Sequence, residues 1–195
     1  MVFFRYDVCD IDFYTEAAVG VAVQPARHGR LGFLDLVTDL KNDNLHSYVF
    51  ALPVNTEIAQ VRGHDGYGFP KWVTDLDVDI AADKATARVA NDTGGTDVAF
   101  SAPTPTQKSF PSGERVASLT SYTTINGAWH SVLNQTNALS AGTTRFPRDL
   151  GLELGQGRMS DELRALKPIR TLQLDVMTEG QIALHMPVPY SVRST

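Results

Sequence analysis

Hydrophobic and polar residues alternate with a period of two along much of this 195-residue chain. The clearest case runs from Trp72 to Ile80, where apolar residues share one parity and Asp75, Asp77 and Asp79 share the other. This alternation predicts a strand with one buried face and one solvated face. The three aspartates are interpreted as the solvated face rather than as a cation site.

Nine further segments have strand-like patterns, and turn sequences separate many of them. They are Phe3–Val8, Ala17–Val23, Leu31–Val37, Tyr48–Val54, Ala85–Val89, Asp97–Ser101, Ser118–Ile125, Leu172–Met177 and Gln181–Met186. Turn signals occur at 41–44, at 91–95 and at Glu179-Gly180. Short strands spaced by turns predict a mainly β protein, built as an antiparallel barrel or a sandwich.

Helical signals are few. Residues Asn55–Gln60 predict a short capped helix, and Ser160–Leu166 predicts a second one, with Ser160 as its N-cap and Pro168 beyond its end. The Pro-, Thr- and Ser-rich stretch Ala102–Ser112 is interpreted as a surface loop. Neither an internal repeat nor a domain boundary is evident, so residues 1–195 are expected to form a single domain.

Composition narrows the class of protein. Apolar residues make up 43 % of the chain and charged residues 20 %, which favours a folded core over disorder. A net charge of −5 disfavours binding to nucleic acid or to anionic membranes. There is no apolar run of about 20 residues, no signal-peptide pattern and only one cysteine, Cys9. We therefore expect a soluble cytoplasmic protein without an intrachain disulfide.

The candidate chemistry lies in the stretch from Gly63 to Trp72. Lys71 is one of only five lysines and is bracketed by Phe69, Pro70 and Trp72. Burial disfavours the ammonium form, so a lysine among such neighbours can be held as a neutral amine. A neutral amine condenses with ketones and aldehydes to form a Schiff base. The alternative is that the Lys71 stem lies on the Trp72 ring and its ammonium stays in water.

Other motifs give no competing site. The glycines of this stretch have the order G-x-x-G-x-G and precede a strand, which does not fit a phosphate-binding loop. A Gly-x-Ser-x-Gly nucleophile motif is absent, and the five histidines form no close pair of metal ligands. No cofactor and no metal are expected.

Two elements carry a resemblance to a known family. Gly63-His64-Asp65 followed by Phe69-Pro70-Lys71 resembles the Gly-Arg-Glu…[Phe/Tyr]-Pro-Lys-Lys signature of the acetoacetate decarboxylase superfamily. Tyr14-Thr15-Glu16 is similar to its Tyr-x-Glu element. The resemblance implies an antiparallel β-barrel with a few short helices, usually in a homo-oligomer, and a domain shortened at its N-terminus.

The resemblance also implies roles for individual residues. Lys71 matches the Schiff-base lysine, Glu16 a proton-transfer or substrate-facing acid, and Asp65 the signature glutamate. His64 stands in place of the signature arginine and Trp72 in place of the second lysine. The residues expected to bind substrate are His64, Tyr14, Tyr67, Phe69, Trp72 and, as an additional pocket carboxylate, Asp7.

The sequence therefore predicts a lyase that forms a Schiff base with a small or medium oxo acid through Lys71. Two branches of that chemistry stay open: decarboxylation, and aldolase or dehydratase chemistry through the same iminium. The alternative from another class is an inert barrel that binds or cyclises an apolar, polyketide-like molecule without covalent chemistry. Trp72, Trp129, Tyr67 and Phe69 could line such a cavity.

Overall fold

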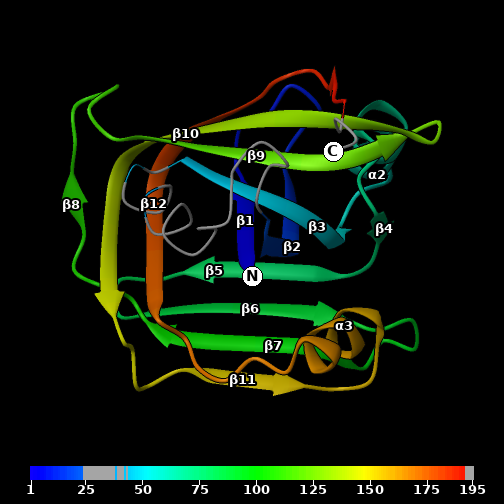
Figure 1. Ribbon diagram of the computed structural model, residues 1–195. Coiled ribbons are helices and arrows are strands. Elements are labelled where there is room, and N and C mark those ends of the chain that lie inside the picture. The colour runs from blue at the N-terminus through cyan, green and yellow to red at the C-terminus, as the bar shows by residue number, and fades with distance from the viewer. Residues whose placement is uncertain (24–37, 39–41, 43, 192–195) are drawn as a thin grey trace.

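The chain folds into two packed sheets. The structure is a computed structural model that describes residues 1–23, 38, 42 and 44–191. The predicted strand Leu31–Val37 lies outside these residues. Within them, strands dominate and the helices are short, which confirms the expected mainly β class (Figure 1).

The larger sheet has the strand order β1-β2-β3-β9-β10-β12, with β4 beside β3 and with β8 and β13 beside β10. The smaller sheet has the order β11-β7-β6-β5. The strands of the larger sheet are β1 (Val2–Tyr6), β2 (Tyr14–Ala22), β3 (Asn44–Val54), β4 (Lys71–Val73), β8 (Lys108–Ser109), β9 (Val116–Ile125), β10 (Ala128–Arg145), β12 (Gln173–Leu184) and β13 (Val188–Pro189). Those of the smaller sheet are β5 (Leu76–Ile80), β6 (Lys84–Ala90), β7 (Thr96–Pro103) and β11 (Gly151–Leu154).

The expected antiparallel barrel is not confirmed. Most pairs are antiparallel, but β3 pairs in parallel with both β4 and β9. The parallel β3–β4 pair arises because residues 55–70 carry the chain back beside β3 through α2 (Glu57–Val61) and a π-helical turn, η1 (Arg62–Gly66). Among the described strands, the order of each sheet is open rather than closed into a ring.

The single strand predicted from Trp72 to Ile80 is wrong, because the chain changes sheets at Thr74 and Asp75. The Thr74 amide donates to Val54 O in the larger sheet, and its hydroxyl donates to Ala90 O in the smaller one. The Ala90 amide donates to Asp75 O. These hydrogen bonds anchor β4 and β5 to different sheets. The alternation of the sequence is continuous, but the backbone pairing is not.

The turn predicted at Glu179-Gly180 is also wrong. Most of Leu172–Met177 and most of Gln181–Met186 lie in one strand, β12, which stays paired with β10 through a register shift. Gly180 fits this bulge because a Cβ there would lie 2.4 Å from the Met177 sulfur. Glycine at this point therefore marks an irregular strand rather than a chain reversal.

The long strand β10 was missed by the hydrophobic pattern. Its central residues are mostly serine, threonine, asparagine and glutamine, which give no alternation of apolar positions. The strand is held by pairing with β9 along one edge and β12 along the other. Tertiary pairing therefore decides its conformation.

Both predicted helices are present. Thr56 caps α2, and its hydroxyl accepts from the Ala59 amide. The second helix, α3 (Arg158–Leu166), begins two residues before the predicted N-cap, Ser160. Its first turn is capped instead by Asp97, whose carboxylate comes from β7.

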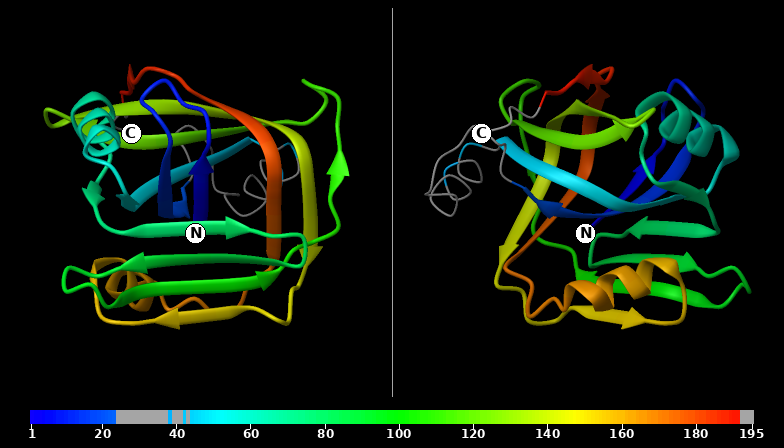
Figure 2. Two further views of the ribbon diagram at one scale, coloured as in Figure 1. Left: turned by 180° about the vertical axis from the view of Figure 1, so that it is seen from behind. Right: turned by 45° about the vertical axis from the view of Figure 1, so that its right-hand side comes forward.

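One hydrophobic core lies between the two sheets (Figure 2). Ala17, Val19 and Ala51 of the larger sheet pack there against apolar residues of the smaller sheet and α3. The opposite face of β2 and β3 carries a second cluster, which includes Ala18 and Leu52. This opposite face also carries the candidate site. Among the described residues, no helix is long and apolar enough to cross a membrane.

Candidate active site

Lys71 and Glu16 form a buried ion pair. The Lys71 Nζ lies 2.5 Å from the Glu16 Oε2. The side chains are 7 % and 10 % exposed, respectively. Residues 55 positions apart in the chain are therefore brought into direct contact away from bulk solvent.

The register of three adjacent strands creates this contact. Glu16 of β2 lies opposite Val54 of β3, and Lys71 of β4 lies opposite Leu52 of β3. Val54 and Leu52 are two residues apart and therefore point to the same face of the sheet. The strand β3 thus sets the acid and the amine side by side on that face.

Gly63 makes room for the lysine. A Cβ at this position would lie 2.3 Å from both Cδ and Cε of Lys71, and 3.0 Å from its Nζ. The Lys71 stem therefore passes directly against the backbone of η1. This close approach gives a physical reason for glycine at the start of the sequence Gly63-His64-Asp65.

Two stacked tyrosines border the pair. The Lys71 Nζ lies 5.6 Å from the centre of the Tyr14 ring, and the rings of Tyr14 and Tyr6 are 4.6 Å apart. Burial, followed by the charge of Glu16, raises the pKa of both hydroxyls, so each stays protonated at neutral pH and can donate a hydrogen bond. Tyr14 is where the sequence predicted it. Tyr6 was missed, although it pairs with Tyr14 across β1 and β2.

Burial and the contact with Lys71 shift the pKa of Glu16 in opposite directions. Burial raises the pKa of its carboxyl group, while the charge of Lys71 and the hydrogen bond from it oppose that rise.

Tyr67 and Phe69, which the sequence analysis expected to bind substrate, belong to the apolar cluster on this face of the sheet. Both are buried, and their rings stack with centres 6.1 Å apart. They belong to the cluster that contains Ala18 and Leu52, and Leu52 is the register partner of Lys71. This cluster gives the site an apolar floor.

Trp72 lies on the other side of the sheet. Successive residues of a strand point to opposite faces, so the Trp72 side chain packs against the core between the sheets. The Arg158 guanidinium carbon lies 4.2 Å from the centre of its ring. The structure therefore brings Trp72 together with Arg158 rather than with Lys71, and the Lys71 stem does not lie on the indole.

His64 and Asp65 pair with each other at the surface. The His64 Nδ1 lies 2.9 Å from the Asp65 Oδ1, and the side chains are 64 % and 72 % exposed. Asp7, the further predicted carboxylate, is also exposed and pairs with Arg5. Among the described residues, no ion pair or hydrogen bond joins Asp65 or Asp7 to Lys71 or Glu16. In the described part of the chain, no three His, Cys, Asp or Glu side chains are grouped so that they could hold a metal ion.

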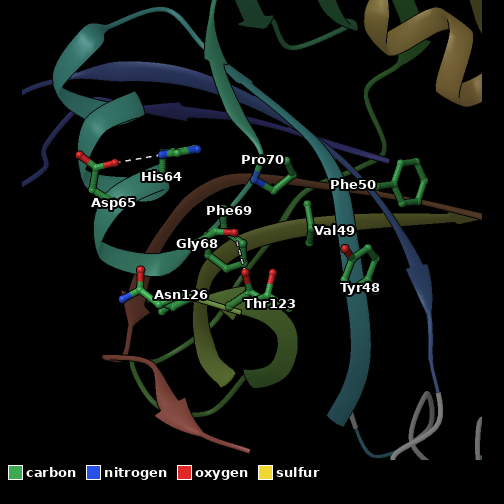
Figure 3. A pocket seen from close by; sticks show the side chains of 12 residues that line it. Tyr48, Val49, Phe50, His64, Asp65, Gly68, Phe69, Pro70, Thr123 and Asn126 are labelled. Carbon is green, nitrogen blue, oxygen red and sulfur yellow. Dashed lines mark hydrogen bonds and ion pairs between the residues drawn. The ribbon is translucent and has the colours of Figure 1, made fainter. Parts of the chain in front are cut away.

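A separate pocket of about 610 Å³ lies beside the His64–Asp65 pair (Figure 3). Its walls come from β3, the segment 64–70 and the end of β9 with the turn that follows. The lining residues are Tyr48, Val49, Phe50, His64, Asp65, Gly68, Phe69, Pro70, Thr123, Thr124, Ile125 and Asn126. The Thr123 hydroxyl donates to Gly68 O and ties β9 to the segment that leads into β4. Lys71 and Glu16 are not among these residues.

Solved structures share this fold. No family model matches the chain, and no curated protein matches it by sequence. The acetoacetate decarboxylase of Legionella pneumophila superposes with a TM-score of 0.60 at 12 % identity, over 96 % of this chain and 70 % of that one. MppR, an enduracididine biosynthesis enzyme, superposes in its pyruvate complex with a TM-score of 0.59 at 13 % identity, over 91 % of this chain and 66 % of MppR.

A further likeness is to an acetoacetate decarboxylase-like enzyme of Sphingomonas wittichii, with a TM-score of 0.54 at 14 % identity. It covers 92 % of this chain and 69 % of the other. The chain thus has the acetoacetate decarboxylase-like fold, and the resemblance seen in the sequence is confirmed at that level. The chain spans about two thirds of the length of MppR.

Proposed function

We propose that the protein is a Schiff-base lyase that acts on a small oxo acid through Lys71. The observation that carries this proposal is the buried contact between the Lys71 amine and the Glu16 carboxyl group. A nucleophile within hydrogen-bond reach of an acid or base is the arrangement that covalent catalysis requires. The three proteins whose solved structures share this fold, MppR among them, are enzymes.

The reaction begins when the proton shared by the pair resides on Glu16. The neutral Lys71 amine then attacks the substrate ketone to give a carbinolamine. Protonation of its hydroxyl group by Glu16 releases water and leaves an iminium ion. The iminium accepts the electron pair of the bond that breaks next, so the lysine itself serves as the electron sink.

Two fates of the iminium follow from the same geometry. If carbon dioxide departs, the electron pair forms an enamine; Glu16, which has taken up a proton from water, protonates the enamine carbon to restore an iminium, and hydrolysis of that iminium releases the product ketone. If a proton is lost from the adjacent carbon instead, the enamine can attack an aldehyde or expel a hydroxyl group. Both fates need one group that gives and accepts protons beside the nitrogen, and Glu16 has a raised pKa suited to this work.

Glu16 is a better candidate for proton transfer than Asp65. It contacts the Lys71 nitrogen, whereas Asp65 is exposed and hydrogen-bonded to His64. Aromatic residues complete the site. Tyr14 can donate a hydrogen bond to a developing oxyanion, and Tyr67 and Phe69 exclude water from one side. That the protein is a cytoplasmic homo-oligomer stays a prediction.

Reductive trapping tests the proposal. The purified protein is incubated with pyruvate or acetoacetate and sodium cyanoborohydride, and its intact mass is measured. The expected result is one adduct, located on Lys71 by peptide mapping and absent from Lys71→Arg, which keeps the charge but forms no imine. Lys84→Arg, a change at an exposed lysine of β6, is the matched control and should label like the wild type. Equal labelling of Lys71→Arg would refute the mechanism.

A second function is favoured by the pocket beside His64. Its aromatic and hydroxyl-bearing walls could bind an apolar ligand without covalent chemistry, since neither Lys71 nor Glu16 lines it. A Val49→Trp substitution would fill this pocket while leaving the ion pair in place. Loss of ligand binding in Val49→Trp, with binding kept in Lys71→Arg, would favour this reading over the lyase.

A further inference from the structure

The strand that carries Lys71 is short and begins at the reactive residue. β4 has three residues, Lys71–Val73, and pairs in parallel with β3. The strand β9 also pairs in parallel with β3, but only as far as the register pair of Tyr48 and Tyr122. Among the described strands, none pairs with residues 49–51 along this edge of β3. Lys71 therefore lies at a break in the sheet, where one strand has ended and the next begins.

The turn before Lys71 is held from two sides. On the side of η1, the Phe69 amide donates to Gly63 O at 3.0 Å. On the side of β9, the Thr123 hydroxyl donates to Gly68 O at 2.6 Å (Figure 3). Thr123 is 4 % exposed and is the first residue of β9 beyond its pairing with β3. Its side chain thus makes the link that strand pairing does not make.

Gly68 fits closely against the end of β9. Its φ of +68° favours glycine, and a Cβ there would lie 2.5 Å from Thr124 O and 2.9 Å from Ile125 Cγ1. The turn, residues 68–70, also forms a wall of the pocket of about 610 Å³. Movement of the turn closer to β9 is therefore blocked by atoms, but the pocket leaves room for a shift in other directions. The hydrogen bond from Thr123 opposes such a shift.

We propose that Thr123 is a positioning residue for the reaction at Lys71: its hydroxyl holds Gly68 O and so fixes the turn that sets the amine against its acid. This inference rests on the proposed function, which it deepens by adding a residue that acts through the backbone. The contact between Lys71 and Glu16 is 2.5 Å long, and the lysine stem passes directly against Gly63. A shift of the turn by about 1 Å would break this alignment, and a misplacement of that size can slow a reaction about a hundredfold.

Removal of the hydroxyl group tests this role. Thr123→Val keeps nearly the same shape but cannot donate to Gly68 O. Trapping uses pyruvate or acetoacetate, with enough cyanoborohydride that imine formation limits the rate. At saturating substrate the rate should fall about tenfold to a hundredfold, while the half-saturating concentration changes by less than about twofold. Thr123→Ser keeps the donor and should come within about threefold of the wild-type rate. An equally slow Thr123→Ser would assign the loss to shape and overturn the inference.

Two readouts separate positioning from folding. Each variant is measured at a temperature at which circular dichroism shows it to be folded. A displaced turn lowers the rate of labelling but not its final extent, so Thr123→Val should still reach one adduct per chain. Thr104→Val is the matched control, because the Thr104 hydroxyl makes the same kind of bond, to Ala81 O at 2.8 Å, beside the smaller sheet. Its trapping rate should equal that of the wild type.

The outcomes separate this inference from the lyase. If Thr123→Val forms the adduct as fast as the wild type, Thr123 has no positioning role and the Schiff-base lyase stands. If the wild type forms no adduct, the lyase is refuted, and acetylation by acetic anhydride decides the role of Thr123 instead. Release of the turn should raise the labelling of Lys71 relative to the exposed Lys84 about fivefold or more, because the amine leaves its buried contact. An unchanged ratio in Thr123→Val would overturn the inference.

Discussion

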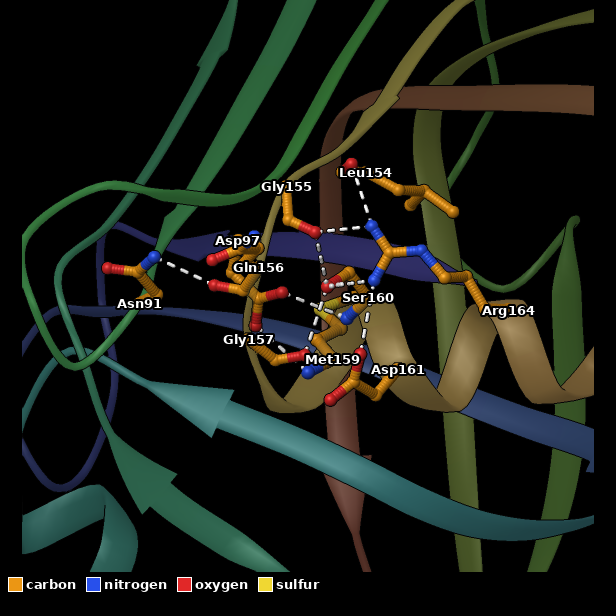
Figure 4. A network of polar contacts seen from close by, with 10 residues as sticks. All are labelled: Asn91, Asp97, Leu154, Gly155, Gln156, Gly157, Met159, Ser160, Asp161 and Arg164. Carbon is orange, nitrogen blue, oxygen red and sulfur yellow. Dashed lines mark hydrogen bonds and ion pairs between the residues drawn. The ribbon is translucent and has the colours of Figure 1, made fainter.

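Two buried carboxylates, Glu16 and Asp97, are held in opposite ways. Asp97 accepts hydrogen bonds from the amides of Met159 and Ser160, both at 2.9 Å, and so caps α3 from the neighbouring strand (Figure 4). Glu16 has a side-chain partner instead, the amine of Lys71. Backbone amides cannot give up their protons, whereas an ammonium group can.

This difference separates an acid held by fixed backbone donors from an acid paired with a side-chain amine. The surroundings of Asp97 are fixed by further bonds: the Ser160 hydroxyl donates to Gly155 O and Gly157 O, and a Cβ at Gly157 would lie 2.5 Å from the Asp97 carboxyl carbon. Such a site stabilises one geometry. Glu16 instead contacts a side-chain amine, and the proposed chemistry rests on this contact.

The largest effect is expected at Lys71. Lys71→Met should abolish turnover and lower the free energy of unfolding by about 3–5 kcal/mol at pH 7, because it leaves Glu16 buried without its partner. Removal of Lys71 takes away the influence that holds the Glu16 pKa down, so burial raises it further above the ordinary value of 4.5. A raised carboxyl pKa in the folded state means that stability is lost as pH rises through the interval between the unfolded and folded values.

Urea denaturation between pH 4 and pH 8 measures this dependence. The free energy of unfolding of Lys71→Met relative to the wild type should therefore be highest near pH 4 and fall toward pH 8. The double variant Lys71→Met/Glu16→Gln should lose this slope, since no buried carboxyl group is left to ionise. A slope of the same size in the double variant would contradict the assignment to Glu16.

Glu16→Gln should have the next largest effect, and this effect should be on activity. It keeps the shape of the side chain but removes the proton carrier, so kcat should fall about 10²–10⁴-fold while KM changes little. Steady-state kinetics on the substrate identified by trapping measures both constants. Glu57→Gln, at an exposed acid in the first turn of α2, should leave both unchanged.

Asp97→Ala should lower stability but leave the chemistry at Lys71 intact. It leaves two buried amides of α3 without an acceptor, so unfolding should become easier by about 2–4 kcal/mol. Trapping at Lys71 should persist at temperatures where the variant is folded. Asp161→Ala removes an exposed acid from the same first turn and should cost about 1 kcal/mol or less. If thermal unfolding gave equal costs for the two variants, the special role of Asp97 as the buried cap of α3 would be contradicted.

Gly63→Ala should have the smallest effect on stability. The added methyl group meets the flexible stem of Lys71, which can move aside, so the cost should stay near 1 kcal/mol. The shifted amine should keep its charge close to Glu16 but lose the geometry of the 2.5 Å contact, and kcat should fall about tenfold or more. Gly94→Ala is the comparison for expression and folding, because a Cβ at Gly94 has open space around it and only its φ of 80° is unfavourable.

Sequence patterns predicted those parts of the fold in which local chemistry and tertiary pairing agree. Ala85–Val89 and Ser118–Ile125 fall within β6 and β9, and Thr56 caps the first predicted helix. They did not predict β10, whose polar residues become a strand because neighbours on both sides supply the hydrogen bonds.

The sequence by itself determined the mainly β class and, through its two family-like elements, singled out as candidates Lys71, Glu16 and Tyr14, which the structure brings together. Periodicity is local, and a motif records residue types, so both can be read from the chain. Only the tertiary structure decided that the alternation from Trp72 breaks between two sheets, that Trp72 faces the core, and that the Thr123 hydroxyl reaches Gly68 O. Those outcomes depend on strand register and on contacts between residues far apart in the chain, which no local pattern encodes.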